Sequence, residues 1–184
     1  MKNKLIKNIL EKIFGNPLIF KLFQEKLLLK RYTLFKKELV KKYVVFDEPV
    51  LDFACSTGYM SEVFPQDNNN YIGIDINERY LKTARELYPN RKFVLTKKRK
   101  FPFENNSIGS ILCFSVFHHL SDEELSEVLI VFRKLLKKRG KIIVTDGLPW
   151  RQQKTLLNKL IIRLDIGNYC RTTTEFIEIF KKYF

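Results

Sequence analysis

Acidic and imidazole side chains in this sequence have the types and spacing of a small-molecule site. Asp52 lies in the stretch VLDFACSTGYM, where an apolar run meets an acid, then small residues, then Gly58. Asp75 ends the apolar run YIGID, and the pair His118 and His119 follows the run ILCFSVF. Carboxylates accept hydrogen bonds from hydroxyl groups, and histidine exchanges a proton near neutral pH. These residues define a candidate site that the surrounding elements must assemble.

The stretch VLDFACSTGYM has the position of a dinucleotide-binding loop but not its glycines. In the fingerprint G-x-G-x-x-G the glycines permit a tight turn, close pyrophosphate approach and helix packing. The corresponding residues are Ser56, Gly58 and Ser61, so only the middle glycine is present. A pyrophosphate ligand is therefore disfavoured, although Asp75 stands where a ribose hydroxyl pair would bind. An oxidoreductase using NAD is the least favoured function.

Short apolar runs alternate with amphipathic segments from residue 49 onward. We expect strands at 50–54, 71–75, 92–95, 109–115 and 141–146. Helices are expected around 59–63, 79–87 and 122–136. This alternation predicts an α/β fold, a Rossmann-like doubly wound and mostly parallel sheet with helices on both faces. Ligands of such sheets bind at the carboxyl ends of the strands, which is where the candidate residues fall.

The first 47 residues have a helical pattern of apolar residues and lysines. We expect them to form an N-terminal helical lid over an α/β domain at 48–184. Both KLIKNILEKIF and LIFKLFQEKLLLKRYTLFKKELVKKY place apolar residues on one side of a helix and lysines on the other. Packing on their own domain is favoured over anchoring at a membrane surface.

Composition limits the class of protein and its partners. The chain has 184 residues, 45% of them hydrophobic, which is enough for one globular domain. A net charge of +14 raises the possibility of nucleic acid, but lysine-rich composition explains it without such a partner. Three dispersed cysteines and two histidines argue against disulfides and a metal site. With no apolar run long enough to span a bilayer, we expect a cytoplasmic protein.

Four blocks in order resemble class I S-adenosylmethionine-dependent methyltransferases, in particular the type 11 group. They are VLDFACSTGYMSEVF, YIGIDINERYLKTA, FPFENNSIGSILCFSVFHHLSDEE and FRKLLKKRGKIIVTD. The resemblance covers about residues 48 to 146 and extends to the segment LDIGNYCRTTTEFIEIFKKYF, which is similar to the late helical region of some members. It implies S-adenosylmethionine as cofactor and methyl transfer, with a small molecule as the favoured acceptor.

The resemblance also implies roles for individual residues in cofactor binding. The loop under the methionine part of the cofactor would consist of Asp52, Ala54, Ser56 and Gly58. Asp75 would accept hydrogen bonds from both ribose hydroxyls, and Ile76 would pack on the adenine. Ser115 and Val116 would face the methionine and the transferred methyl group. His118, His119 and Asp146, near strand ends, are the candidates to take a proton from the acceptor.

Structural roles are the alternatives for several of these residues. Asp52 could bond loop amides, and Asp75 could cap the helix that follows it. At least one of His118 and His119 could be a cap or core residue. Gly140, after LLKKR, is predicted to be a helix C-cap.

The chain departs from the family pattern in three respects. Ala54 and Ser56 replace usual glycines, and Lys97 stands where the family has an acid that accepts from the adenine amino group. Lysine can only donate. We expect the usual last two-strand hairpin to be missing after KIIVTD, which would leave an apolar sheet edge. Either the chain is a shortened gene product, or a partner or oligomer covers that edge. These departures motivate an alternative function, a non-catalytic methyltransferase-fold protein that binds cofactor weakly or acts through a partner.

Overall fold

The structure, a computed structural model, describes residues 16–19, 22, 30–97, 101–149, 152 and 169–184. The predicted helix KLIKNILEKIF lies outside the described residues, as do residues 20–21 and 23–29 of the second predicted helix. The described part of that second helix is α3 (Lys30–Tyr43). The division into a lid at 1–47 and a domain at 48–184 stays a prediction.

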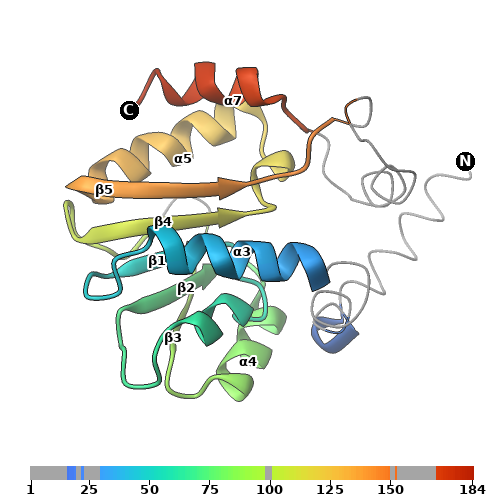
Figure 1. The fold of residues 1–184 in the computed structure, drawn as a ribbon, viewed down its shortest axis with the longest axis vertical. Coiled ribbons are helices and arrows are strands. Elements are labelled where there is room, and N and C mark those ends of the chain that lie inside the picture. Colours follow the sequence, from blue (N-terminus) through green and yellow to red (C-terminus); the bar gives the residue numbers. More distant parts are fainter. Residues whose placement is uncertain (1–15, 20–21, 23–29, 98–100, 150–151, 153–168) are drawn as a thin grey trace, which may run out of the picture.

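Within the described residues the sheet has five strands, all paired in parallel, in the order β3-β2-β1-β4-β5. The strands are β1 (Val50–Phe53), β2 (Tyr71–Asp75), β3 (Lys92–Leu95), β4 (Ile108–Phe114) and β5 (Leu136–Thr145). The chain builds β1 to β3 outward on one side, then returns to β4 beside β1 (Figure 1). This reversal creates a switch point at the carboxyl ends of β1 and β4. The predicted doubly wound α/β fold is confirmed.

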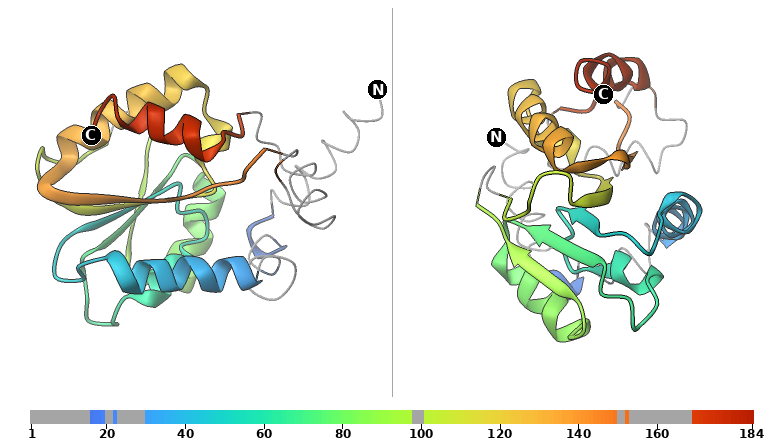
Figure 2. Two further views of the ribbon diagram at one scale, coloured as in Figure 1. Left: turned by 45° about the horizontal axis from the view of Figure 1, so that its top comes forward. Right: turned by 90° about the vertical axis from the view of Figure 1, so that its left-hand side faces the viewer.

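Helices cover both faces of the sheet and bury two apolar clusters (Figure 2). On one face, Val40 of α3 packs in a cluster with residues of η1 (Tyr59–Val63) and α4 (Glu78–Leu87). On the other face, α5 (Asp122–Leu135) buries Leu125, Leu129 and Phe132, and α7 (Thr173–Phe180) packs against the same cluster. Helix α3 therefore shares its core with the sheet.

The predicted start of β5 was wrong. The strand begins at Leu136, directly after α5, and not at Lys141. Gly140 consequently lies inside β5 and is not a helix C-cap, because α5 already ends at Leu135. A Cβ at Gly140 would come within 2.8 Å of the Leu136 side chain, so the glycine serves close packing in an irregular stretch of the β4–β5 pairing.

In the described residues, β5 forms one edge of the sheet. Its exposed positions carry basic side chains, Lys138, Arg139 and Lys141, which discourage further strand pairing. Ile142 and Val144 are half-buried in the cluster that α7 joins, so this strand exposes less apolar surface than expected. That a partner or oligomer covers the edge stays a prediction.

The buried Arg171 fixes the start of α7 to the segment between β4 and α5. Its guanidinium donates to the carbonyls of Phe117 (2.9 Å) and Leu120 (2.8 Å) and to the Asp122 carboxylate (2.7 Å). Phe117 lies in η2 (Phe117–His119), and its ring faces two phenylalanines of α7. The late helical region is thereby held over the segment that carries both histidines.

Gly58 allows η1 to follow β1 within a few residues. Its φ is +75°, and an added Cβ would lie 2.5 Å from the Phe93 ring. We expect Gly58→Ala to lower the free energy of unfolding by about 2–4 kcal/mol, from left-handed strain and overpacking together. Ser56→Gly is the matched control: Ser56 has a φ of 54°, so glycine relieves strain there and stability should change by less than about 1 kcal/mol. Equal losses in urea unfolding would contradict this view of the loop.

Candidate cofactor site

Left-handed backbone marks the switch point of the sheet. Ala54 (φ 58°), Ser56 (φ 54°) and Gly58 (φ 75°) follow β1, and Ser115 (φ 57°) follows β4. Among the described residues only Asn106 shares this conformation. A side chain in left-handed backbone costs about 1–2 kcal/mol per residue, and such strain gathers at functional sites. The positive φ at Ala54 and Ser56 is also the physical reason why glycine suits these positions.

Asp75 ties this loop to the end of β2. Its Oδ2 accepts the backbone N–H of Ser56 (2.9 Å), and its Oδ1 accepts that of Asn77 (2.8 Å). Burial raises the pKa of Asp75, while these backbone hydrogen bonds act to lower it. The helix cap is Asn77, which accepts from Arg79, so the alternative role of Asp75 as that cap was wrong. Next to Asp75, Ile76 is 72% exposed and offers a bare apolar side chain.

Asp52 is a buried acid beneath the loop. It is 3% exposed, and its Oδ2 accepts the Tyr71 hydroxyl at 2.6 Å. Burial raises its pKa to about 7, against the opposing effects of the Tyr71 hydrogen bond and the positive charge of Lys36. Asp52 therefore bonds a neighbouring strand, and not loop amides as the structural alternative supposed.

Lys36 on α3 is a site residue that sequence reasoning missed. It was expected on the solvent side of the helix, but it is 4% exposed and shares a buried stripe with Thr33 and Val40. Its Nζ donates to the hydroxyls of Ser115 (3.0 Å) and Tyr59 (3.2 Å). The spacing of Thr33, Lys36 and Val40, three and then four residues apart, was the available signal, because such positions share one helix face.

Aromatic rings surround the Lys36 ammonium. Nζ lies 4.3 Å from the centroid of Tyr32, 5.7 Å from Phe114 and 5.9 Å from Tyr59. Burial lowers the pKa of Lys36 to about 8, while the charges of Asp52 and Asp146 act to raise it. Removal from water thus outweighs the favourable charges near it, which makes this a costly place for a cation.

The structure brings His118 and Asp146 together as a buried pair and leaves His119 exposed beside them. The Asp146 carboxylate lies in hydrogen-bond contact with His118 Nδ1, and both side chains are buried. The same carboxylate accepts the backbone N–H groups of Phe117 (2.8 Å) and His118 (3.1 Å). His119 is exposed, although its ring lies 4.1 Å from that of His118. An acid bonded to one ring nitrogen fixes the tautomer and orientation of the imidazole.

The remaining predicted residues have simple positions. Val116 is buried just after β4, at the start of η2. Lys97 is exposed after β3, next to Thr96, which donates its backbone N–H to the Asp75 carbonyl. In the part of the chain that the structure describes, no group of three or more histidine, cysteine or acidic side chains is arranged to hold a metal. Likewise, no described helix has the length and apolar character needed to cross a bilayer.

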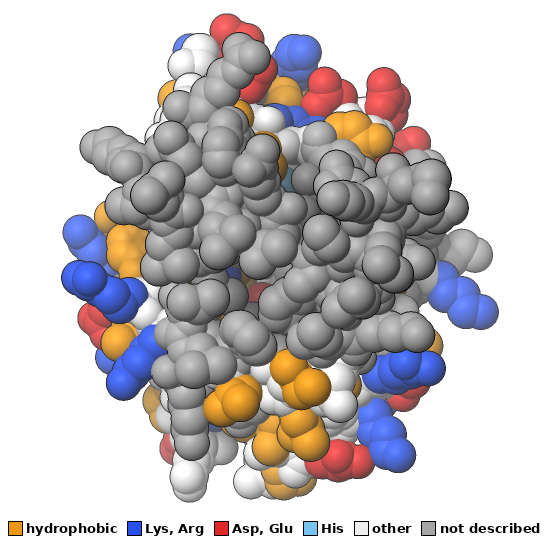
Figure 3. Space-filling view, turned by 90° about the vertical axis from the view of Figure 1, so that its right-hand side faces the viewer, with side chains coloured by type: hydrophobic (Ala, Val, Ile, Leu, Met, Phe, Trp, Pro, Cys, Tyr) orange, Lys and Arg blue, Asp and Glu red, His pale blue; other side chains and the backbone are white. Residues whose placement is uncertain are grey.

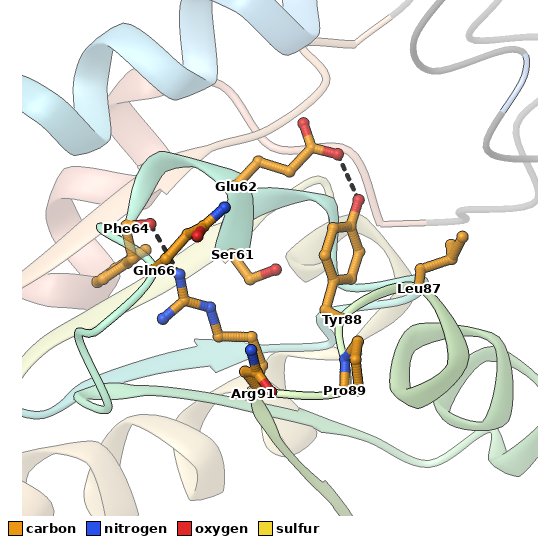
Figure 4. A pocket seen from close by; sticks show the side chains of 9 residues that line it. Ser61, Glu62, Phe64, Gln66, Leu87, Tyr88, Pro89 and Arg91 are labelled. Atoms are coloured by element: carbon orange, nitrogen blue, oxygen red, sulfur yellow. Dashed lines mark hydrogen bonds between the residues drawn. The ribbon is translucent and has the colours of Figure 1, made fainter.

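On the face at the carboxyl ends of the strands, acidic and basic side chains are mixed at the α5–α7 end, and apolar side chains gather toward α4 (Figure 3). A separate pocket of about 400 Å³ lies between η1 and the turn after α4. Figure 4 shows the Glu62–Tyr88 contact and the Arg91 guanidinium bonded to the Phe64 carbonyl (2.7 Å). None of the predicted site residues lines this pocket.

The raised pKa of Asp52 predicts a pH dependence of stability. The folded protein keeps a proton on Asp52 up to about pH 7, whereas the unfolded chain loses it near the ordinary value of 3.8. This contribution to stability is complete below pH 3.8 and is lost as the pH rises toward 7. The free energy of unfolding of Asp52→Asn should therefore fall less steeply with pH over that interval, by up to about 1.4 kcal/mol per pH unit.

Urea unfolding at a series of pH values measures this slope. Asp67→Asn, which changes an exposed acid between η1 and β2, should leave the slope of the wild type unchanged. Identical slopes for the wild type and Asp52→Asn would contradict the assignment of a protonated Asp52.

Comparison with known proteins places the chain in one family. The model for the methyltransferase domain matches residues 51–144. An uncharacterized methyltransferase of Geobacillus is 32% identical over 98 residues, which are 53% of this chain and 46% of that protein. The chain thus spans about half the length of the curated relatives it matches.

Solved structures agree on the fold. The PH0226 protein of Pyrococcus horikoshii has a TM-score of 0.66 at 22% identity, over 87% of this chain and 85% of that one. A phosphoethanolamine N-methyltransferase of Haemonchus contortus, solved with S-adenosylhomocysteine, has a TM-score of 0.68 at 14% identity, over 97% of this chain and 44% of that one. With the family match over half of its length, the chain belongs to the methyltransferase domain family of S-adenosylmethionine-dependent proteins.

Proposed function

We propose that this chain binds S-adenosylmethionine at the carboxyl ends of β1, β2 and β4 and transfers its methyl group to a small-molecule acceptor. The observation that carries the proposal is the gathering of left-handed residues after β1 and β4, next to the strand-ending Asp75. Strained backbone at a switch point is typical of a ligand site. Membership of the methyltransferase family indicates that this ligand is S-adenosylmethionine.

The adenosine end of the cofactor fits the end of β2. Asp75 accepts backbone N–H groups, among them those of Ser56 and Asn77, and a carboxylate has about four acceptor sites, so it can still accept from the ribose. The exposed Ile76 offers an apolar surface to the adenine. Lys97 cannot accept from the adenine amino group, which costs one hydrogen bond of about 1 kcal/mol and leaves binding possible.

The methionine end fits the ends of β1 and β4. Asp52 and the turn containing Ala54, Ser56 and Gly58 would lie under it, and Ser115 and Val116 would border the methyl group. Methyl transfer from a sulfonium needs alignment and exclusion of water more than acid–base chemistry. Where the acceptor must lose a proton, His118 is the better-placed base, since Asp146 orients its ring.

The alternative is a protein that binds the cofactor without turnover or acts through a partner. The exposed Lys97 at the adenine position favours it. Nucleic-acid binding, a third possibility, rests only on the net charge of +14.

Calorimetric titration with S-adenosylmethionine tests cofactor binding. We expect Asp75→Asn to weaken binding about tenfold or more, because an amide loses charge and one acceptor toward the ribose. Asp67→Asn, an exposed acid in the loop before β2, should bind like the wild type. A wild type that binds no cofactor would overturn the proposed function.

Transfer of a labelled methyl group to small-molecule fractions of a cell extract tests turnover. For an acceptor that must lose a proton, His118→Gln should lower the rate about 100-fold with unchanged cofactor affinity, whereas His119→Gln should lower it less than threefold. Equal effects of the two changes would contradict the role of His118. Cofactor binding without transfer to any fraction would favour the non-catalytic alternative.

A further inference from the structure

Within the part of the chain that the structure describes, Lys36 is a buried cation without an anion in contact. Its Nζ donates to two neutral hydroxyls, those of Tyr59 and Ser115. Among the described residues, no carboxylate oxygen lies within 4.0 Å of this nitrogen. An ammonium group has three donors, and burying its charge is unfavourable unless an anion compensates it. The third donor and the charge are therefore available to a ligand.

The position of Lys36 is that of the proposed methionine site. Ser115 follows β4 in left-handed backbone, and Tyr59 begins η1 directly after the loop that follows β1. The Lys36 side chain extends from α3 to Ser115 and Tyr59, so it bridges the segments that follow β4 and β1. Its ammonium lies among aromatic rings that exclude water, which strengthens any charge interaction formed there.

We propose that Lys36 binds the α-carboxylate of the cofactor, and that α3 is held over the site by this contact. The inference rests on the proposed function. It assigns Lys36 as a cofactor-binding residue supplied by the N-terminal segment and not by the loop after β1.

Charge complementarity favours the carboxylate of the cofactor over that of an acceptor. The charge of Asp52 acts on the pKa of Lys36, so this acid and this base lie near one another. The ammonium group of S-adenosylmethionine would favour the ionised form of Asp52, and its carboxylate would compensate Lys36, so the pair suits a zwitterionic amino-acid end. Without the carboxylate, Lys36 would only repel the sulfonium, because like charges at short range disfavour binding.

A ligand–protein double-mutant cycle tests the assignment. The two ligands are S-adenosylhomocysteine and its decarboxylated analogue, which keeps the ammonium group and lacks only the carboxylate. The two proteins are the wild type and Lys36→Met, which keeps an unbranched side chain that is one atom shorter and removes its charge. Calorimetry gives the four affinities, and their ratio isolates the pairwise contribution.

We expect the wild type to prefer S-adenosylhomocysteine over the analogue by about 10- to 100-fold, and Lys36→Met to bind the two within about threefold. Lys41→Met, which removes an exposed charge from the same helix, should keep the preference of the wild type. Binding of the analogue by Lys36→Met shows that this variant is folded. If Lys36→Met fails to fold, Lys36→Arg keeps the test, because it retains the charge and should retain a preference of at least fivefold.

A wild type that binds both ligands equally would overturn the assignment while leaving the proposed function in place. So would a Lys36→Met variant that keeps the full preference, which would mean that the carboxylate contacts another group. A wild type that binds neither ligand would overturn the proposed function itself.

Discussion

The hydrogen bond from the backbone N–H of Ser56 to Asp75 Oδ2, 2.9 Å long, joins the turn after β1 to the end of β2. It fixes a residue in left-handed backbone, which costs about 1–2 kcal/mol, and it compensates a carboxylate that burial would otherwise destabilise. Gly58 then turns the chain into η1 against Phe93. The position of the loop, and with it the shape of the proposed cofactor site, depends on this contact between neighbouring parallel strands.

Buried charge is the second organising feature. Asp52 and Lys36 are both almost inaccessible to solvent. Burial raises the pKa of Asp52 and lowers that of Lys36, and each shift favours the neutral form. Neither charge has an oppositely charged partner in contact within the described residues, although the two act on one another across the site. An arrangement of this kind is costly for folding alone. It becomes favourable when a ligand brings charges of both signs, as a cofactor with an amino-acid end does.

The sheet could be predicted from sequence because each apolar run corresponds to a strand and the amphipathic segments between the runs correspond to helices. The start of β5 could not, since the basic run KKRG after α5 has the composition of a helix end, and pairing with β4 overrides it. Asp75 was identified by its place at a strand end, but its bonds to Ser56 and Asn77 depend on folding across the sheet. Lys36 was missed because lysine is rarely buried, so its place on the apolar stripe of α3 was interpreted as solvent-facing.

Amide chemical-shift changes on titrating the ¹⁵N-labelled full chain with S-adenosylhomocysteine test the central claim most directly. The account predicts that the largest changes fall at Ser56, Gly58, Ile76 and Ser115, the residues at the carboxyl ends of β1, β2 and β4, with a smaller group at Lys36 on α3. Changes confined to the separate pocket around Ser61, Tyr88 and Arg91, or no changes at all, would contradict it.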